Sequence, residues 1–96
     1  MNYTIEATNE QKQLTQELGL QIAKIRHDLG ISRETLASKS KMHLQLIYDI
    51  ESGRKNASIY MIARIARGLD LPLSDILNMK AVIFIWQRLQ AELQNE

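Results

Sequence analysis

The spacing of apolar residues predicts a chain built from helices. Between Thr8 and Gly30, apolar residues recur three or four positions apart, as on one face of an α-helix; they are Leu14, Leu18, Ile22, Ile25 and Leu29. Thr8 and Gln11 have the spacing of a capping box, and Gly30 closes the helix. Gly19 interrupts the run at a cost of about 1 kcal/mol relative to alanine. The part before Leu18 is therefore either an extension of this helix or a separate turn.

Two short helices with a tight connection near residues 41–43 are expected next. Ser32 suits the N-cap of the first, because its hydroxyl can accept an unpaired backbone N–H, and Gly53 ends the second in a left-handed conformation. Inward-facing apolar residues mark both helices: Leu36 and Ala37 in the first, Ile47 and Ile50 in the second. The second helix then points a mostly polar face outward, formed by His43, Leu44, Gln45, Tyr48 and Asp49.

Two further helices complete the predicted core. Ser58 can cap the fourth, whose expected buried stripe is Ile59, Ile62, Ala66 and Leu69. Pro72 prevents simple continuation of that helix. A short fifth helix is then predicted from Leu73, Ile76 and Leu77.

Residues 78–96 carry an apolar segment beyond this core. Its 3-4-3-4 spacing suits a helix–helix seam, and the residues that show it are Met79, Val82, Trp86, Leu89 and Leu93. Residues 81–86 are also rich in β-branched and aromatic types, so a strand pairing with its copy is the alternative. Strong helix formers in 87–94 favour the helix. Both alternatives imply a homodimer, held by Val82, Ile83, Phe84, Ile85, Trp86 and Leu89.

The middle of the chain resembles the Cro and lambda-repressor-like family, the XRE-type helix-turn-helix regulators. In that family a Thr/Ser-Gln-x-x-Leu-Ala run precedes a helix ending in Ile-x-x-Ile-Glu-x-Gly-Lys/Arg. The matching residues here are Ser32, Leu36, Ala37, Ile47, Ile50, Glu51, Gly53 and Arg54, and the resemblance covers residues 18–77. It implies an all-α, five-helix DNA-binding domain. Arg33 replaces the family's glutamine, and Ala57 its usual proline.

The resemblance implies a set of DNA contacts. Its base-reading positions fall on Leu44, Gln45 and Asp49, with His43 and Tyr48 beside them. The Gln45 amide can pair with adenine N6 and N7, whereas Leu44 offers only an apolar surface and Asp49 would repel phosphates. Phosphate contacts are expected at both ends of the motif, from Ser32, Arg33, Ser52, Arg54 and Lys55.

Arg26 and Glu51 are expected to form a structural ion pair. In the family, the matching arginine of the first helix pairs with the glutamate before the glycine and locks the recognition helix to the core. Glu51 follows Ile47 by four residues and so lies on the inward side of its helix. A carboxylate placed there without a cationic partner would be costly.

Charge is unevenly distributed along the 96 residues, whose net charge is +1. Residues 20–70 contain nine Lys or Arg and five Asp or Glu, a balance of +4, whereas residues 1–19 carry −2 and residues 71–96 carry −1. A basic motif with acidic flanks is what a phosphate-facing surface requires.

Other classes of function have little support in the sequence. With no cysteine, neither a disulfide nor a thiolate metal site can form, and His27 and His43 lack metal-ligand spacing. No paired carboxylates, phosphate loop or nucleophile elbow is present, so we expect neither an enzyme nor a cofactor. No signal peptide or membrane span is recognisable, which predicts a cytoplasmic protein.

The sequence therefore predicts a tail (1–7), a DNA-binding domain (8–77) and a dimerisation segment (78–96). The expected function is a homodimeric transcriptional regulator of a two-fold symmetric operator, acting by blocking or contacting RNA polymerase. In its compact size, the chain resembles restriction–modification controller proteins and short phage-type repressors. Two alternatives are an antitoxin whose apolar segment masks a toxin, and a protein-interaction module that no longer binds DNA.

Overall fold

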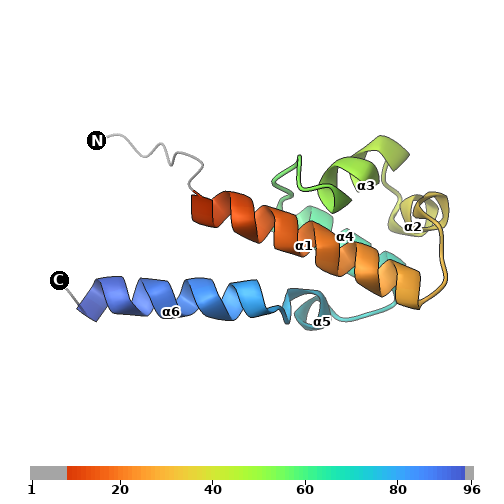
Figure 1. Cartoon of the computed structure of the whole chain (residues 1–96). Coiled ribbons are helices and arrows are strands. Elements are labelled where there is room, and N and C mark those ends of the chain that lie inside the picture. The colour runs from red at the N-terminus through yellow and green to blue at the C-terminus, as the bar shows by residue number, and fades with distance from the viewer. Residues whose placement is uncertain (1–8, 95–96) are drawn as a thin grey trace.

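A computed structural model describes residues 9–94 as an all-helical fold (Figure 1). The described residues form α1 (Asn9–Asp28), α2 (Arg33–Ser40), α3 (Leu44–Glu51), α4 (Ile59–Gly68), α5 (Leu73–Leu77) and α6 (Lys80–Gln94). The long α1 lies between α3 on one side and α5 with α6 on the other, and it contacts all three. Thr8, expected in a capping box with Gln11, lies outside the described residues.

Helix α1 passes through Gly19 without a break, so the alternative of a separate turn before Leu18 is wrong. Gly19 is buried where α1 crosses the end of α3. A Cβ atom on it would lie 2.3 Å from the carbonyl oxygen of Ile50 and 2.6 Å from that of Glu51. The glycine that weakens the helix locally therefore permits the two helices to touch through their backbones.

The local signals around α2 and α3 act as expected. The hydroxyl of Ser32 accepts the backbone N–H of Thr35 at 3.1 Å and so caps α2. Lys41 takes a left-handed conformation, with φ of 54°, and thereby produces the tight turn into α3. Gly53 follows the end of α3 with φ of 77°, a value that suits glycine. Ser58 caps α4 by accepting the N–H of Met61.

The core lies among α1 to α5, and its residues differ from the predicted stripes at two positions. Ile59 is exposed, so its predicted burial in the stripe of α4 is wrong, and Leu29, the last member of the first apolar run, is exposed as well. Leu29 follows the last residue of α1, and Ile59 is the first residue of α4, so both lie at helix ends. Ile65 is fully buried instead. The completely buried large residues are Ile22, Leu36, Ile47, Ile50, Ile62, Ile65 and Ile76.

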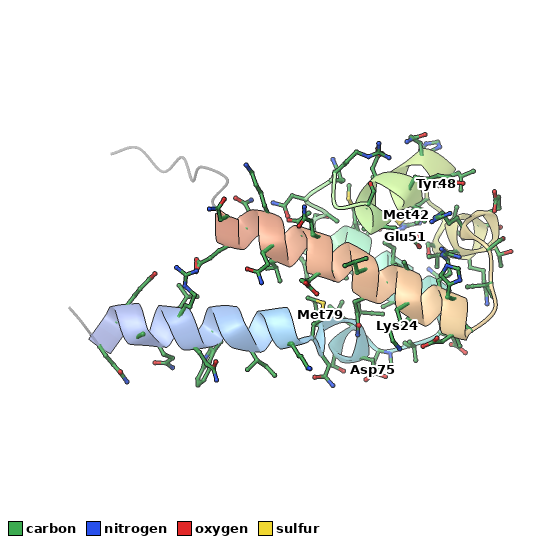
Figure 2. All side chains as sticks on the ribbon, in the orientation of Figure 1. Lys24, Met42, Tyr48, Glu51, Asp75 and Met79 are labelled. Carbon is green, nitrogen blue, oxygen red and sulfur yellow. The ribbon has the colours of Figure 1, made fainter. Side chains whose placement is uncertain are left out.

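The C-terminal segment is helical, and the alternative of a strand over residues 81–86 is wrong. Met79 is buried at the junction of α5 and α6 beside α1 (Figure 2), so it belongs to the fold and not to a free seam. Helix α6 then runs back along the outside of α1. Among residues 9–94, no helix has both the length and the apolar character needed to cross a membrane.

Candidate nucleic-acid interface

The outer face of α3 presents the predicted reading residues to solvent. His43 is the N-cap of α3, and the first turn of the helix contains no acidic residue. His43, Gln45 and Tyr48 are exposed, whereas Leu44 and Asp49 are half-buried. Figure 2 shows Tyr48 on the outer side of α3 and Glu51 between α3 and α1. All five predicted residues therefore lie on one short helix or at its cap.

Asp49 is held by neighbouring polar groups. The Gln45 side chain donates Nε2–H to Oδ1 of Asp49 at 3.0 Å, and Nη2 of Arg54 lies 3.6 Å from the same oxygen. Arg54 also donates Nε–H to the hydroxyl of Ser52 at 3.0 Å. Since an amide and a guanidinium both face it, the carboxylate repels a nearby phosphate less than an isolated Asp would.

Arg26 and Glu51 lie together in the interior, joining α1 to the end of α3. Arg26 donates Nε–H to Oε2 of Glu51 at 2.8 Å and Nη2–H to Oε1 at 3.1 Å, a bidentate arrangement. Their side chains are only 5% and 4% exposed, respectively. Nη1 of Arg26 donates to the carbonyl oxygen of Ile31, so the same guanidinium also holds the loop before α2.

Arg33 joins this pair from the solvent side, a role that the sequence did not indicate. Its Nε–H donates to Oε1 of Glu51 at 2.8 Å, and its guanidinium lies 4.6 Å from the centre of the Tyr48 ring. This hydrogen bond to the Glu51 carboxylate raises the pKa of Arg33 above its usual value. Because 37% of its side chain stays exposed, Arg33 can still contact a phosphate while its Nε is hydrogen-bonded to Glu51.

The remaining predicted phosphate contacts lie on both sides of the reading helix. Ser32 stands before α2, with its hydroxyl also donating to Oγ1 of Thr35 at 3.0 Å. Ser52, Arg54 and Lys55 follow α3, and all three are exposed. The backbone N–H of Lys55 donates to the carbonyl oxygen of Asp49 at 3.1 Å, which fixes the start of this loop.

Arg64 supports the motif from α4, and sequence reasoning missed it. It donates Nε–H to the carbonyl oxygen of Ser40 and Nη2–H to that of Lys41, at 3.1 and 3.3 Å. These carbonyls end α2, where helical partners are lacking. Tyr60 accepts from Arg64 Nη1 at 2.7 Å and orients the guanidinium. The four-residue spacing of Tyr60 and Arg64 was visible in the sequence, but their target on α2 was not.

The predicted dimerisation residues divide into two groups. Ile83, Trp86 and Leu89 are exposed on α6, together with Leu93. Val82, Phe84 and Ile85 lie within α6, but their side chains are outside what the structure describes. Arg88 reaches back to α1, with its Nε 3.3 Å from Oε1 of Glu10. Trp86 precedes Arg88 by two residues, or about 200° around a helix, and so faces away from α1.

Known proteins share this arrangement. A helix-turn-helix family, HTH_3, matches residues 22–76. The restriction-modification controller protein C.AhdI from Aeromonas hydrophila is 26% identical, with a TM-score of 0.65 over 67% of this chain and 97% of its own. The clp gene regulator ClgR from Corynebacterium glutamicum is 27% identical, with a TM-score of 0.67 over 85% of this chain and 87% of its own. No curated protein sequence matches the chain significantly.

The family match covers more than half of the chain and includes every helix from the second half of α1 to α5. It also contains the buried Arg26–Glu51 pair and the whole exposed face of α3. The chain belongs to the XRE-type helix-turn-helix family of DNA-binding transcriptional regulators.

Proposed function

We propose that this protein is a sequence-specific regulator that binds a two-fold symmetric DNA site as a homodimer. The observation that carries the proposal is the polar outer face of α3, bordered by Arg33 on one side and by Arg54 and Lys55 on the other. A recognition helix enters the major groove with its first turns against the bases, and cations beside it meet the two phosphate strands.

Base reading is assigned to the start of α3. Gln45 is exposed one residue into the helix, and its amide can pair bidentately with adenine. In the free protein one N–H of that amide is donated to Asp49, which leaves its second N–H and its carbonyl oxygen for a base. His43 and Tyr48 flank it as polar contacts, and half-buried Leu44 offers an apolar surface to a thymine methyl group.

We assign the part of the DNA affinity that does not depend on base sequence to the cationic side chains around the motif. Arg33 and Ser32 stand at the start of α2, where the first backbone N–H groups of the helix also favour a phosphate. Arg54, Lys55 and Ser52 occupy the loop after α3. Neutralising phosphates releases counterions, so binding should weaken steeply as salt concentration rises.

Dimerisation is assigned to α6. Among the side chains of α6 that the structure describes, four large apolar ones are exposed, namely Ile83, Trp86, Leu89 and Leu93. Their spacing keeps them within about a third of the helix circumference, on the side turned away from Arg88 and α1. A contiguous apolar face of this kind marks a protein interaction surface, and a second copy of the chain would supply an identical face.

The first experiment is selection of bound sites from random duplexes by the full-length protein, followed by titration of the enriched site at several salt concentrations. We expect an inverted repeat whose half-sites are centred about one DNA turn apart, and a logarithmic affinity that falls linearly with the logarithm of salt. Enrichment of no sequence, together with binding that is insensitive to salt, would contradict the proposal.

The same α6 face favours one second candidate, an antitoxin whose apolar segment covers a toxin. The regulator and the antitoxin differ in which molecule covers the apolar face of α6. A heteromeric partner that remains bound to the purified protein and is lost after Trp86→Glu would favour the antitoxin. A symmetric dimer of this chain alone favours the regulator, which would then act at a promoter by blocking RNA polymerase or by contacting it.

A further inference from the structure

A polar hollow lies beside the reading helix, between the first half of α1 and the loop after α3. Its volume is about 360 Å³. Helix α1 lines it with Gln11, Lys12, Thr15 and Gln16, and the loop lines it with Arg54 and Asn56. The match to the helix-turn-helix family begins at residue 22, so one wall of the hollow consists of residues outside the family match.

The hollow continues the inward face of α1 beyond the core. Lys12 and Gly19 are seven residues apart and so lie on nearly the same side of the helix. Around Gly19 this side is buried against α3. Near Lys12 the same side carries polar and charged residues and is partly open. Such a wall suits a polar ligand.

The charges around the hollow favour an anionic ligand. Lys12 and Arg54 line it, and none of its lining residues is acidic. The nearest acids on α1 lie on the other side of the helix: Glu10 faces Arg88 of α6, and Glu17 lines a separate hollow with Lys24 and Met79. Asp49 approaches Arg54 at 3.6 Å, yet 68% of the Arg54 side chain remains exposed.

The loop is held firmly against α1, so the two walls keep a fixed separation. A Cβ on Gly53 would lie 2.9 Å from Cγ and 3.1 Å from Cα of Gln16. The loop thus rests on α1 through a glycine backbone. Asn56 and Gln16 bring side-chain amides that can donate to an oxyanion, beside the two cations.

We infer that this hollow binds a phosphate of the DNA backbone, so that the first half of α1 extends the footprint beyond the helix-turn-helix motif. The inference rests on the proposed function, because Arg54 belongs both to the hollow and to the phosphate-facing loop. DNA is the chosen source because the hollow is continuous with that loop. A free phosphate or phosphorylated small molecule has the same chemistry, and the experiment separates the two sources.

The test compares full-length Lys12→Ala with the wild type on the selected duplex and on a duplex of unrelated sequence, over a series of salt concentrations. We expect weaker binding to both duplexes, and a slope of log affinity against log salt that is smaller by about 0.9 for each bound protomer. Lys24→Ala is the matched control, since Lys24 lies on the same helix but pairs with Asp28 at 2.9 Å. Its slope should equal that of the wild type, and Lys12→Arg should restore the slope.

Three results would overturn the inference. An unchanged slope for Lys12→Ala, with Arg54→Ala still flattening it, would remove the hollow while leaving the proposed function intact. Backbone amide shifts at Gln16 and Asn56 on adding inorganic phosphate at constant ionic strength, without such shifts on adding DNA, would assign the hollow to a small anion. A wild-type protein without salt-sensitive DNA binding would refute both proposals together.

Discussion

Glu51 determines how the reading helix is held at the scale of single residues. Its carboxylate accepts three hydrogen bonds from two arginines, Arg26 in the interior and Arg33 at the surface. Arg33 in turn lies against the ring of Tyr48 on the outer face of α3. One buried carboxylate therefore connects α1, the start of α2 and the outer face of α3.

Glu51→Ala should destabilise the protein far more than Asp49→Ala does. The first change strands the buried charge of Arg26, which costs about 3–5 kcal/mol. The second removes a pair between half-buried Asp49 and exposed Arg54, worth at most about 1 kcal/mol. Thermal unfolding followed by circular dichroism compares the two, and a domain of this size loses about 4–8 °C for each kcal/mol. Small and equal decreases in Tm would mean that Glu51 does not lock α3.

Gln45→Ala should change sequence preference and leave the salt dependence unaltered. Loss of a bidentate contact to adenine costs roughly 1–3 kcal/mol at one base pair in each half-site. Titration of duplexes substituted at each position would locate that pair. Arg54→Ala is the contrasting variant, because it should weaken all duplexes alike and reduce the salt slope. Unchanged affinity and preference for Gln45→Ala would remove Gln45 from the reading residues.

The role of a residue could be predicted when its partners are close in the sequence, and could not be predicted when its partners are distant in the sequence. Ser32 and Gly53 act within three residues of themselves, so the sequence sufficed for both. Arg64 acts on carbonyls 23 and 24 residues away, and the bond from Arg33 to Glu51 spans 18 residues. No local pattern encodes such contacts, and only the family resemblance suggested the partner of Arg26.

At the scale of elements, the crossing of α1 and α3 depends on the absence of a side chain at Gly19. Sequence reasoning counted this glycine only as a cost to helix stability, because the neighbouring helix that requires it lies 31 residues further along the chain. Periodicity predicted a helix in the region of α1 but left open whether the part before Leu18 belonged to it, and it allowed either a helix or a strand at the start of α6. Periodicity did not predict the exposure of Leu29 and Ile59, because it does not show which residues at the end of a helix lack a packing neighbour.

Gly19→Ala should therefore destabilise the fold although alanine is the better helix former. Its Cβ would meet two backbone carbonyls of α3, which have no flexible end to move aside. The cost of such overpacking is about 1–3 kcal/mol, more than the approximately 1 kcal/mol gained in helix propensity. Urea unfolding measures the net change. Leu20→Ala, at the next and exposed position, is the control and should be nearly neutral; a stabilised Gly19→Ala variant would show that the helices can separate freely.

At the scale of the whole molecule, the two proposed interfaces use different parts of the chain. Apart from the inferred phosphate site at Lys12 of α1, the residues proposed to face DNA lie on α2, α3 and the loop that follows, within the basic residues 20–70. The apolar face lies on α6, which is separated from α3 by α1 (Figure 1). A homodimer formed through α6 would thus leave both recognition helices open to DNA. This division agrees with the charge pattern of the sequence, where the flank from residue 71 onward is slightly acidic.

The dimer proposal leads to a test on α6 itself. In a symmetric dimer both copies bury Trp86, Leu89 and Ile83, and each side chain contributes about 1.5–3 kcal/mol, against a docking cost of at least about 4 kcal/mol. The balance supports association in the micromolar range when that cost is small. We expect the double variant Trp86→Glu with Leu89→Glu to sediment as a monomer, because each copy would then place two carboxylates against the other.

The control is Ala91→Glu, which adds a carboxylate to α6 at an exposed position about 140° around the helix from the centre of the apolar face. It should sediment as the wild type does. On DNA, the monomeric variant should bind an isolated half-site as well as the wild-type protomer does, yet lose the additional affinity for a symmetric site, since its two recognition helices are no longer joined. A double variant that dimerises as tightly as the wild type would place the dimer interface on another surface and leave the apolar face of α6 to a different partner.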